Sequence, residues 1–337
     1  VVDGAISLWH SSLTEPAVPE LSTTKLVAAS RPQNSVSYES VSTARTFCFK
    51  ATIRSNGSKN FEFFYPDWVK GIPRISLTEE LVQFAWEFLR FSGTNLASDL
   101  VVVTKLCQIA SHKLSQGEDK NLWFKFFRNY IYIAVHLIEE SSFTVDAVWE
   151  VLKHFMVEER YNLYGEMHNV LAKNNPYIKI AAGKAERAAK GVLKRLLKKN
   201  VDVMMRRLSK ISFSNPLPCF LTVFQQLESY DNLNLLVVET ARYFNSYGWD
   251  VLVLAILMRL TTLGRSVFQQ DGLNDRQWIQ LLSSFVGKIC QKYPDNIDIS
   301  TLFSFLVKSL HQKETIALNV VKEIFISMGG VQPITNL

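Results

Sequence analysis

The sequence predicts an all-α fold from Ser76 onward, in the form of an irregular HEAT-like α-solenoid of stacked antiparallel helix pairs. Apolar residues recur there every three or four positions, and residues that cap helices or form turns stand at nearly every break. No strand pattern interrupts the series. With 47% apolar and 20% charged residues, most of the chain can bury a core. We therefore expect an irregular lead over residues 1–75 and a helical-repeat domain over residues 76–337.

The lead has no sustained period of either kind. Residues 11–43 are rich in Ser and Thr and contain Pro16, Pro19 and Pro32, a composition typical of irregular chain. Residues 47–53 alternate as a strand would, whereas residues 61–68 are aromatic. The structure of this part stays open.

The helical part is expected to begin with a capping box, in which Ser76 caps the helix and Glu79 follows three positions later. Turn signals stand at Asn175-Pro176, Ser214-Asn215-Pro216, Gly248 and Gly329-Gly330. The expected helices cover residues 76–93, 122–138, 145–155, 178–197, 220–227, 233–244, 249–260, 278–290, 302–310 and 316–328.

The apolar patterns of two late helices indicate how the helices stack. Residues 249–260 are apolar nearly all round, which suits a helix held between layers. Residues 278–290 carry one apolar stripe, which suits an outer layer. About ten helices with short links then favour side-by-side helix pairs, although no fixed-length repeat is visible.

The motifs of the common enzyme and metal-binding classes are absent. The chain has no GxGxxG or GxxxxGK[ST], so neither common phosphate cradle is present. The four cysteines and six histidines show no ligand spacing, and apolar neighbours favour buried thiols. The longest apolar run, residues 251–258, is far shorter than the roughly 20 residues that span a membrane. We predict no enzyme activity, catalytic residue, cofactor, metal ion or membrane contact.

The positive charge is concentrated in one segment. Residues 173–210 hold twelve basic residues against Glu186 and Asp202, whereas the whole chain is only +6, so the remainder is net negative. A solvated helix face explains this pattern, and so does contact with nucleic acid or an acidic partner. Apart from Tyr177, no aromatic residue interleaves the lysines, which argues against base stacking. Contact candidates on the predicted helix at residues 178–197, or directly after it, are Lys184, Arg187, Lys190, Lys194 and Lys198.

Three stretches resemble the THO complex subunit 2 family. They are residues 145–151 (VDAVWEV) with 159–165 (ERYNLYG), residues 185–216, and residues 230–233 (YDNL) with 247–252 (YGWDVL). The resemblance covers roughly residues 122–330, and the first 75 residues show none. The link at residues 263–272 departs from the animal pattern and suggests a fungal member.

The resemblance implies a nuclear, non-catalytic scaffold of the THO/TREX complex, similar in fold to the middle domain of the translation-initiation scaffold. Such a subunit would couple transcription elongation to mRNP assembly and nuclear mRNA export. Its implied partners are other THO complex subunits, a DEAD-box RNA helicase of the export pathway and the mRNA backbone. The expected helicase contacts lie in polar links at residues 210–216 and 247–250. The residues proposed for them are Arg206, Arg207, Lys210, Asn215 and Trp249. An alternative function is a nucleic-acid-binding helical module that acts through residues 173–210.

Overall fold

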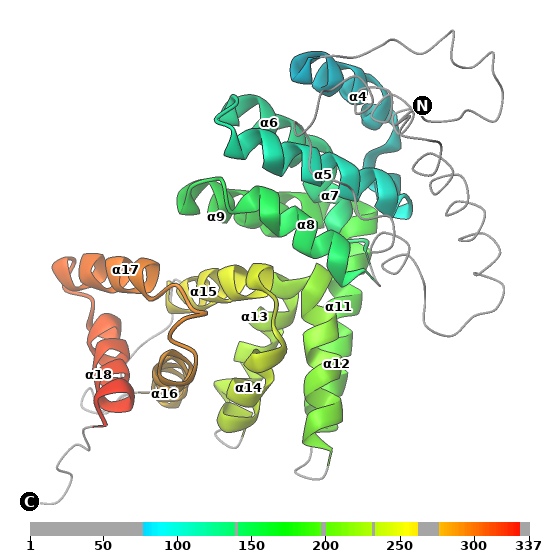
Figure 1. The fold of residues 1–337 in the computed structure, drawn as a ribbon. Coiled ribbons are helices and arrows are strands. Elements are labelled where there is room, and N and C mark those ends of the chain that lie inside the picture. Colours follow the sequence, from blue (N-terminus) through cyan, green and yellow to red (C-terminus); the bar gives the residue numbers. More distant parts are fainter. Residues whose placement is uncertain (1–76, 139–140, 197–199, 231–232, 262–275, 331–337) are drawn as a thin grey trace, which may run out of the picture. The chain divides into compact units, whose positions relative to one another are not determined.

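The computed structural model describes residues 77–138, 141–196, 200–230, 233–261 and 276–330 (Figure 1). Every regular element in these ranges is a helix, and none of them contains a strand. The all-α prediction is therefore confirmed for the described residues. The HEAT-like form remains a prediction, and the expectations for residues 1–75 and for Ser76 lie outside the described residues.

The chain divides into two compact units, Val1–Leu163 and Tyr164–Leu337. The division falls inside helix α9 (Val157–Glu166), so no turn signal or change of composition marks it in the sequence. The predicted boundary between lead and helical domain, at residues 75 and 76, is not tested here and stays a prediction.

Unit 1 is built around helices α5 and α8, which pack against each other. Their starts are capped by side chains: Asp99 accepts from the N–H of Val102 at 3.3 Å, and Ser141 accepts from the N–H of Thr144 at 3.2 Å. A π-helical segment interrupts the long helix between them. The elements are α4 (Thr78–Ser92), the 3₁₀ helix η2 (Gly93–Ser98), α5 (Leu100–Ser115), α6 (Lys120–Phe126), the π-helix η3 (Phe127–Ile131), α7 (Tyr132–Val135) and α8 (Ser142–Leu152).

Helix α4 does not start with the predicted capping box. It begins at Thr78, its N-cap residue is Leu77, and no side chain caps it. The helix thus starts one residue later than a box at Ser76 requires. Glu79 and Glu80 still lie in the first turn, where negative charge is favourable next to the helix N-terminus.

Unit 2 contains the longer series of helices. After the end of α9 it continues through a second π-helix to the last helix, α18. The elements are η4 (Met167–Leu171, π), α10 (Ala172–Asn174), α11 (Pro176–Lys194), α12 (Val201–Ser214), α13 (Pro216–Leu227), α14 (Asn234–Thr240), the 3₁₀ turn η6 (Ala241–Tyr243), α15 (Ser246–Leu260), α16 (Gln277–Lys292), α17 (Ile299–His311) and α18 (Thr315–Gly329).

The helices of unit 2 form two layers, because each helix packs on the one two positions along the chain (Figure 1). One layer runs α11, α13, α15, α17, and the other runs α12, α14, α16, α18. Contacts between neighbours such as α11 with α12 and α17 with α18 join the layers. Alternation of this kind buries a continuous core between stacked helix pairs.

Helix α15 lies in the core of unit 2. Most of its residues are buried, as the apolar pattern over residues 249–260 predicts. Its Asp250 accepts a hydrogen bond from the Tyr164 hydroxyl at 2.8 Å, which satisfies a buried carboxylate. At the end of the helix, Arg259 pairs with the buried Glu228, the C-cap residue of α13, with Nε 2.9 Å from Oε1.

Several helix boundaries match the predicted turn signals. Asn175-Pro176 starts α11, Pro216 is the first residue of α13, and Gly330 ends α18 in the left-handed conformation. The predicted break between helices at Gly248 was wrong. Gly248 lies inside α15, which begins at Ser246 because Asn245 caps it by accepting from the Gly248 N–H at 2.8 Å. Helices α5, α9 and α12 were not predicted.

Candidate interaction surface

Helix α11 presents the first half of the basic segment on its exposed side. Asn175 Oδ1 caps it by accepting from the N–H groups of Tyr177 at 3.0 Å and Ile178 at 3.4 Å. Pro176 suits the first position because it has no N–H to satisfy. One stripe of the helix, with Ile178, Ala185, Ala189, Val192 and Leu193, is buried. The lysines must therefore emerge on the other side.

The predicted contact residues of α11 are exposed. Lys184, Arg187, Lys190 and Lys194 all lie at the surface, and Arg187 also donates from Nε to the Gly183 carbonyl at 3.1 Å. This confirms the predicted exposure for these four, and Lys198 lies outside the described residues. Burying unpaired charge costs several kcal/mol per group, which explains why these cationic side chains are exposed to solvent.

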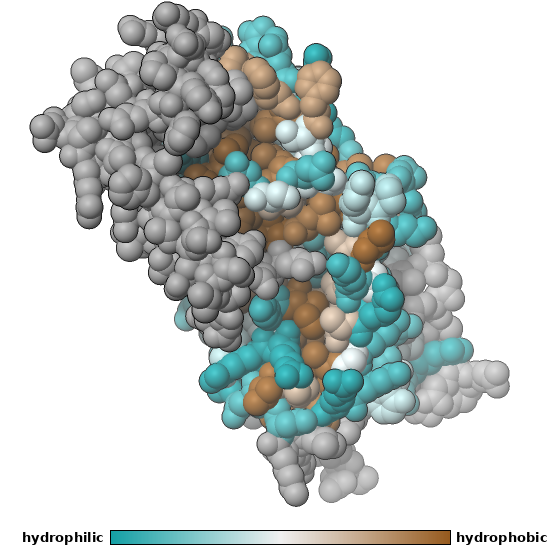
Figure 2. Space-filling view, turned by 90° about the vertical axis from the view of Figure 1, so that its right-hand side faces the viewer, coloured by the Kyte–Doolittle hydropathy of each residue, from teal (hydrophilic) through white to brown (hydrophobic). Residues whose placement is uncertain are grey.

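Helix α12 continues the positive surface. Arg206, Arg207 and Lys210 are exposed, whereas Met204, Met205 and Leu208 are buried. Figure 2 shows hydrophilic side chains over α11 and α12 in its lower half, with hydrophobic ones between them. The residues between 173 and 210 are thus arranged as two amphipathic helices with exposed cations.

Two of the predicted contact residues are buried. Trp249 is 5% exposed and packs on the rings of Phe244, at a centroid distance of 5.9 Å, and Tyr293, at 5.3 Å. Asn215 is 7% exposed, precedes α13 and donates from Nδ2 to Ser214 Oγ at 3.2 Å. Neither side chain can reach a partner in this conformation.

The two links expected to contact a helicase are not polar loops. Residues 210–214 are the last turns of α12, and residues 247–250 lie in α15, where all four are buried. The prediction that these two links are polar loops was therefore wrong, because most of their residues belong to helices. The exposed cations Arg206, Arg207 and Lys210 remain as contact candidates.

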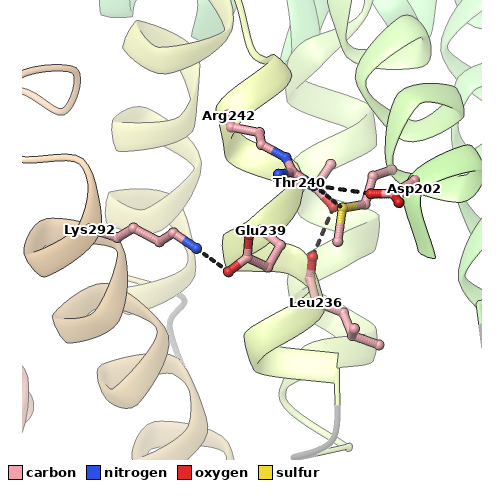
Figure 3. Close-up of polar contacts among 7 residues, drawn as sticks. Asp202, Leu236, Glu239, Thr240, Arg242 and Lys292 are labelled. Carbon is pink, nitrogen blue, oxygen red and sulfur yellow. Dashed lines mark hydrogen bonds and ion pairs between the residues drawn. The ribbon is translucent and has the colours of Figure 1, made fainter. Parts of the chain in front are cut away.

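The structure adds residues that the sequence gave no reason to group (Figure 3). Arg242 of the turn η6 donates from Nη2 to Asp202 of α12 at 3.1 Å. Arg206 and Arg242 both lie over the ring of Tyr243, 5.8 and 4.9 Å from its centroid. Beside them, Lys292 at the end of α16 pairs with Glu239 of α14. Only the packing of α12, α14 and α16 brings these residues together.

His168 lies in the π-helix η4, close to the start of the basic segment. Burial lowers its pKa below the ordinary value, the nearby Glu186 opposes this shift, and Lys173 adds to it. The ring is therefore neutral at pH 7 and adds nothing to the positive surface. A net effect of this sign destabilises the protonated form, so the contribution of His168 to stability falls as the pH drops below about 6.5.

The three described cysteines, Cys107, Cys219 and Cys290, are not activated thiols. Cys107 and Cys219 are fully buried, and burial raises the pKa of the Cys219 thiol to about 12 and that of Cys290 to about 11. Cys48 lies outside the described residues. Among the described side chains no group of three or more His, Cys, Asp and Glu could hold a metal ion. No described helix is long and apolar enough to cross a membrane.

Two family profiles match this chain. Residues 5–206 match the profile described as "THO complex subunit 2 N-terminus", and residues 208–283 match "Transcription- and export-related complex subunit". The first match starts at residue 5, so the family likeness reaches into the first 75 residues, where none was expected. The profiles meet between residues 206 and 208, inside α12.

The matching relatives come from fungi, plants and mammals. THO complex subunit 2 of Saccharomyces cerevisiae is 30% identical over 83% of this chain and 18% of its own length. The protein of the same name from Arabidopsis thaliana is 33% identical over 60% of this chain and 11% of its own. The Homo sapiens protein is 27% identical over 75% of this chain and 17% of its own.

This chain thus spans less than a fifth of the length of these relatives. Identities of this size to proteins of three kingdoms do not test the expected fungal origin, which stays a prediction. A profile match over more than half of the chain does establish the family. The chain belongs to the THO complex subunit 2 family.

Proposed function

We propose that this chain is a non-catalytic scaffold segment of a THO complex in the nucleus. It organises other THO subunits and helps to couple transcription elongation to mRNP assembly and nuclear mRNA export. Membership of the THO complex subunit 2 family supports the proposal. The observation that carries it furthest is the exposed row of cations on α11 and α12, held in place by buried apolar stripes.

A stacked-helix scaffold suits such a role for a physical reason. The two layers of unit 2 fix the spacing of side chains on its surface, so a partner that binds several of them meets a preformed pattern. Exposed cations on one helix face then select partners of opposite charge and speed their encounter.

The docking of a DEAD-box RNA helicase is the finer part of the proposal. A scaffold can shift such an ATPase between open and closed arrangements only by binding one of them better than the other. The exposed residues Arg206, Arg207 and Lys210 supply the charges for this contact. We leave Asn215 and Trp249 out of the proposed contact, because both side chains are buried.

The test uses the full-length protein assembled with its co-expressed THO subunits. Arg206, Arg207 and Lys210 are changed together to Glu. In a matched control, the exposed Lys308 of α17, Lys322 of α18 and Lys313 of the link between these helices are changed to Glu. We expect both variants to assemble, and only the first to lose most of the stimulation of ATP hydrolysis by the helicase. Equal stimulation by both variants would contradict the proposed contact.

Binding of the mRNA backbone through residues 173–210 is a second candidate function. Lys184, Arg187, Lys190 and Lys194 are exposed on one helix, and each can neutralise a phosphate. Binding of single-stranded RNA should then weaken with salt, with a log–log slope of about −3 for four contacts. Changing the four residues to Glu should abolish binding, and a flat salt dependence would contradict phosphate contact.

A further inference from the structure

The exposed surface shared by α12, α14, η6 and α16 carries a cluster that joins two residues of the basic segment to residues from distant parts of the chain. We call it the Arg–Tyr cluster, and it lies within unit 2. Figure 3 shows two of its ion pairs, Asp202 with Arg242 and Glu239 with Lys292. Its members are Asp202, Arg206, Glu239, Arg242, Tyr243, Lys292 and Tyr293.

The cluster is held in a fixed arrangement. The Ser209 hydroxyl donates to the Tyr243 carbonyl at 2.7 Å, which ties the turn η6 to α12. Two guanidinium groups lie over the Tyr243 ring, and Asp202 fixes the nearer one, that of Arg242. Lys292 lies 5.8 Å from the centroid of the Tyr293 ring. Side chains ordered in this way lose little conformational freedom when a partner binds.

The ionic contacts of the cluster contribute little to the fold. The side chains of Arg242 and Asp202 are 44% and 74% exposed, and those of Lys292 and Glu239 are both 40% exposed. Water and salt screen such pairs, so their stabilising effect is small. Arginine and tyrosine, by contrast, are enriched at the centres of protein interfaces, where a planar group and a ring offer large contact area at low entropic cost.

The charge of this surface indicates what it binds. The cluster itself holds the cations Arg206, Arg242 and Lys292, and Arg207 and Lys210 follow on the exposed part of α12. The described carboxylates of the cluster are Asp202 and Glu239. The surface is net positive, so its partner is acidic. The two carboxylates lie next to the cations that would bind an RNA strand. An RNA strand carries a negative charge on every phosphate, so these carboxylates would repel the phosphates closest to them. An acidic peptide can place its charges at intervals and avoid them.

We propose that the Arg–Tyr cluster is a docking site for an acidic segment of a partner protein. The inference rests on the scaffold role proposed above and deepens it. An aromatic or aliphatic residue of the segment would pack beside Tyr243, and its carboxylates would bind Arg206, Arg207 and Lys210. The guanidinium of Arg242, already paired with Asp202, has further N–H groups that can bind a carboxylate.

Photo-cross-linking in the assembled complex tests the proposal. p-Benzoylphenylalanine replaces Gln291, the exposed neighbour of Lys292, in the full-length protein, and a second version carries it at the exposed Lys313 as a control. We expect the first version to cross-link to a segment of another subunit rich in Asp and Glu. A cross-link at position 291 to RNA, to a segment without acidic excess, or to nothing would overturn the inference.

Charge reversal then measures the contact. A peptide copied from the cross-linked segment should bind at least about tenfold more weakly after Arg206→Glu with Arg242→Glu, and Lys308→Glu with Lys322→Glu should leave it unchanged. Arg242→Lys keeps the charge but loses the planar group, and it separates stacking from charge if the double variant misfolds. Equal binding by all variants would contradict the site.

Size-exclusion chromatography of the same complexes separates the two proposals. If the unmodified protein does not assemble with THO subunits, the scaffold role fails. If the complex assembles but position 291 gives no acidic cross-link, only the docking site fails.

Discussion

Two sets of ionic and polar contacts in unit 2 differ in burial and therefore in what they do. In the layer of α13 and α15, Glu228 is 7% exposed and pairs with Arg259, and Tyr164 donates to the buried Asp250. In the layer of α12, α14 and α16, the pairs of Asp202 with Arg242 and of Glu239 with Lys292 lie at the surface. The inner contacts fix the fold because their loss leaves buried charge unsatisfied. The outer ones leave cations accessible to a partner.

The largest expected effect comes from breaking the inner pair. Glu228→Ala leaves the Arg259 guanidinium, whose side chain is only 20% exposed, without its carboxylate. We expect the free energy of unfolding to fall by about 2–3 kcal/mol, below the full loss for a deeply buried pair because Arg259 reaches water. Urea unfolding followed by circular dichroism measures it.

Glu239→Ala is the matched control for this prediction. It removes a carboxylate of the same type from an exposed pair, and its effect should stay below about 1 kcal/mol. Equal losses of stability in the two variants would contradict the expected difference between the buried and the exposed ion pair.

Gly287→Ala should disturb the contact between α16 and α18. A Cβ atom at Gly287 would lie 2.6 Å from the Glu323 carbonyl oxygen, and backbone at that distance must move. We expect a loss of about 1–3 kcal/mol, measured by the same urea unfolding. Gly183→Ala in α11 meets nothing within 4 Å, and it should instead stabilise the helix by about 0.5–1 kcal/mol. A stabilising Gly287→Ala would show that α16 and α18 are less closely packed.

Tyr164→Phe tests the second inner contact. It removes one hydrogen bond to the buried Asp250 and leaves the ring in place against Tyr247, 5.8 Å away between centroids. The expected loss is about 1–2 kcal/mol, because the carboxylate keeps its burial but loses a donor. Tyr177→Phe, at a 60% exposed position, is the control and should change the thermal midpoint little.

Most of the fold could be predicted because helix periodicity is a local property. Helices α11, α15, α16 and α18 carry clear apolar patterns, and they were expected within a few residues of their bounds. Helix α5 was missed because the β-branched run at residues 101–103 disfavours helix prediction, although tertiary packing overrides it. Helix α9 was missed because its sequence is mostly polar.

The candidate surface was predictable only in part, because sequence patterns report local structure and part of this surface depends on tertiary packing. Lys184, Arg187, Lys190 and Lys194 lie on one helix, so their spacing already places them together. Arg242, Tyr243 and Lys292 come from distant segments and meet Arg206 only because α12, α14 and α16 stack. Trp249 was taken for a contact residue because its string matched the family, but such strings preserve core packing as well as surfaces.

The smallest expected effect on stability comes from Lys292→Gln, and it sharpens the comparison most. The pair with Glu239 is exposed, so we expect a loss below about 0.5 kcal/mol at low salt and none at 0.5 M salt, where screening removes the attraction. The same substitution should weaken binding of the acidic segment, because a cation of the Arg–Tyr cluster is gone. Thermal unfolding and peptide titration at both salt concentrations measure the two effects. Lys308→Gln, exposed on α17, is the control and should change neither. A loss of stability without a loss of binding would show that the pair of Lys292 with Glu239 stabilises the fold, as the buried pairs do. It would also show that Lys292 is not part of the docking site.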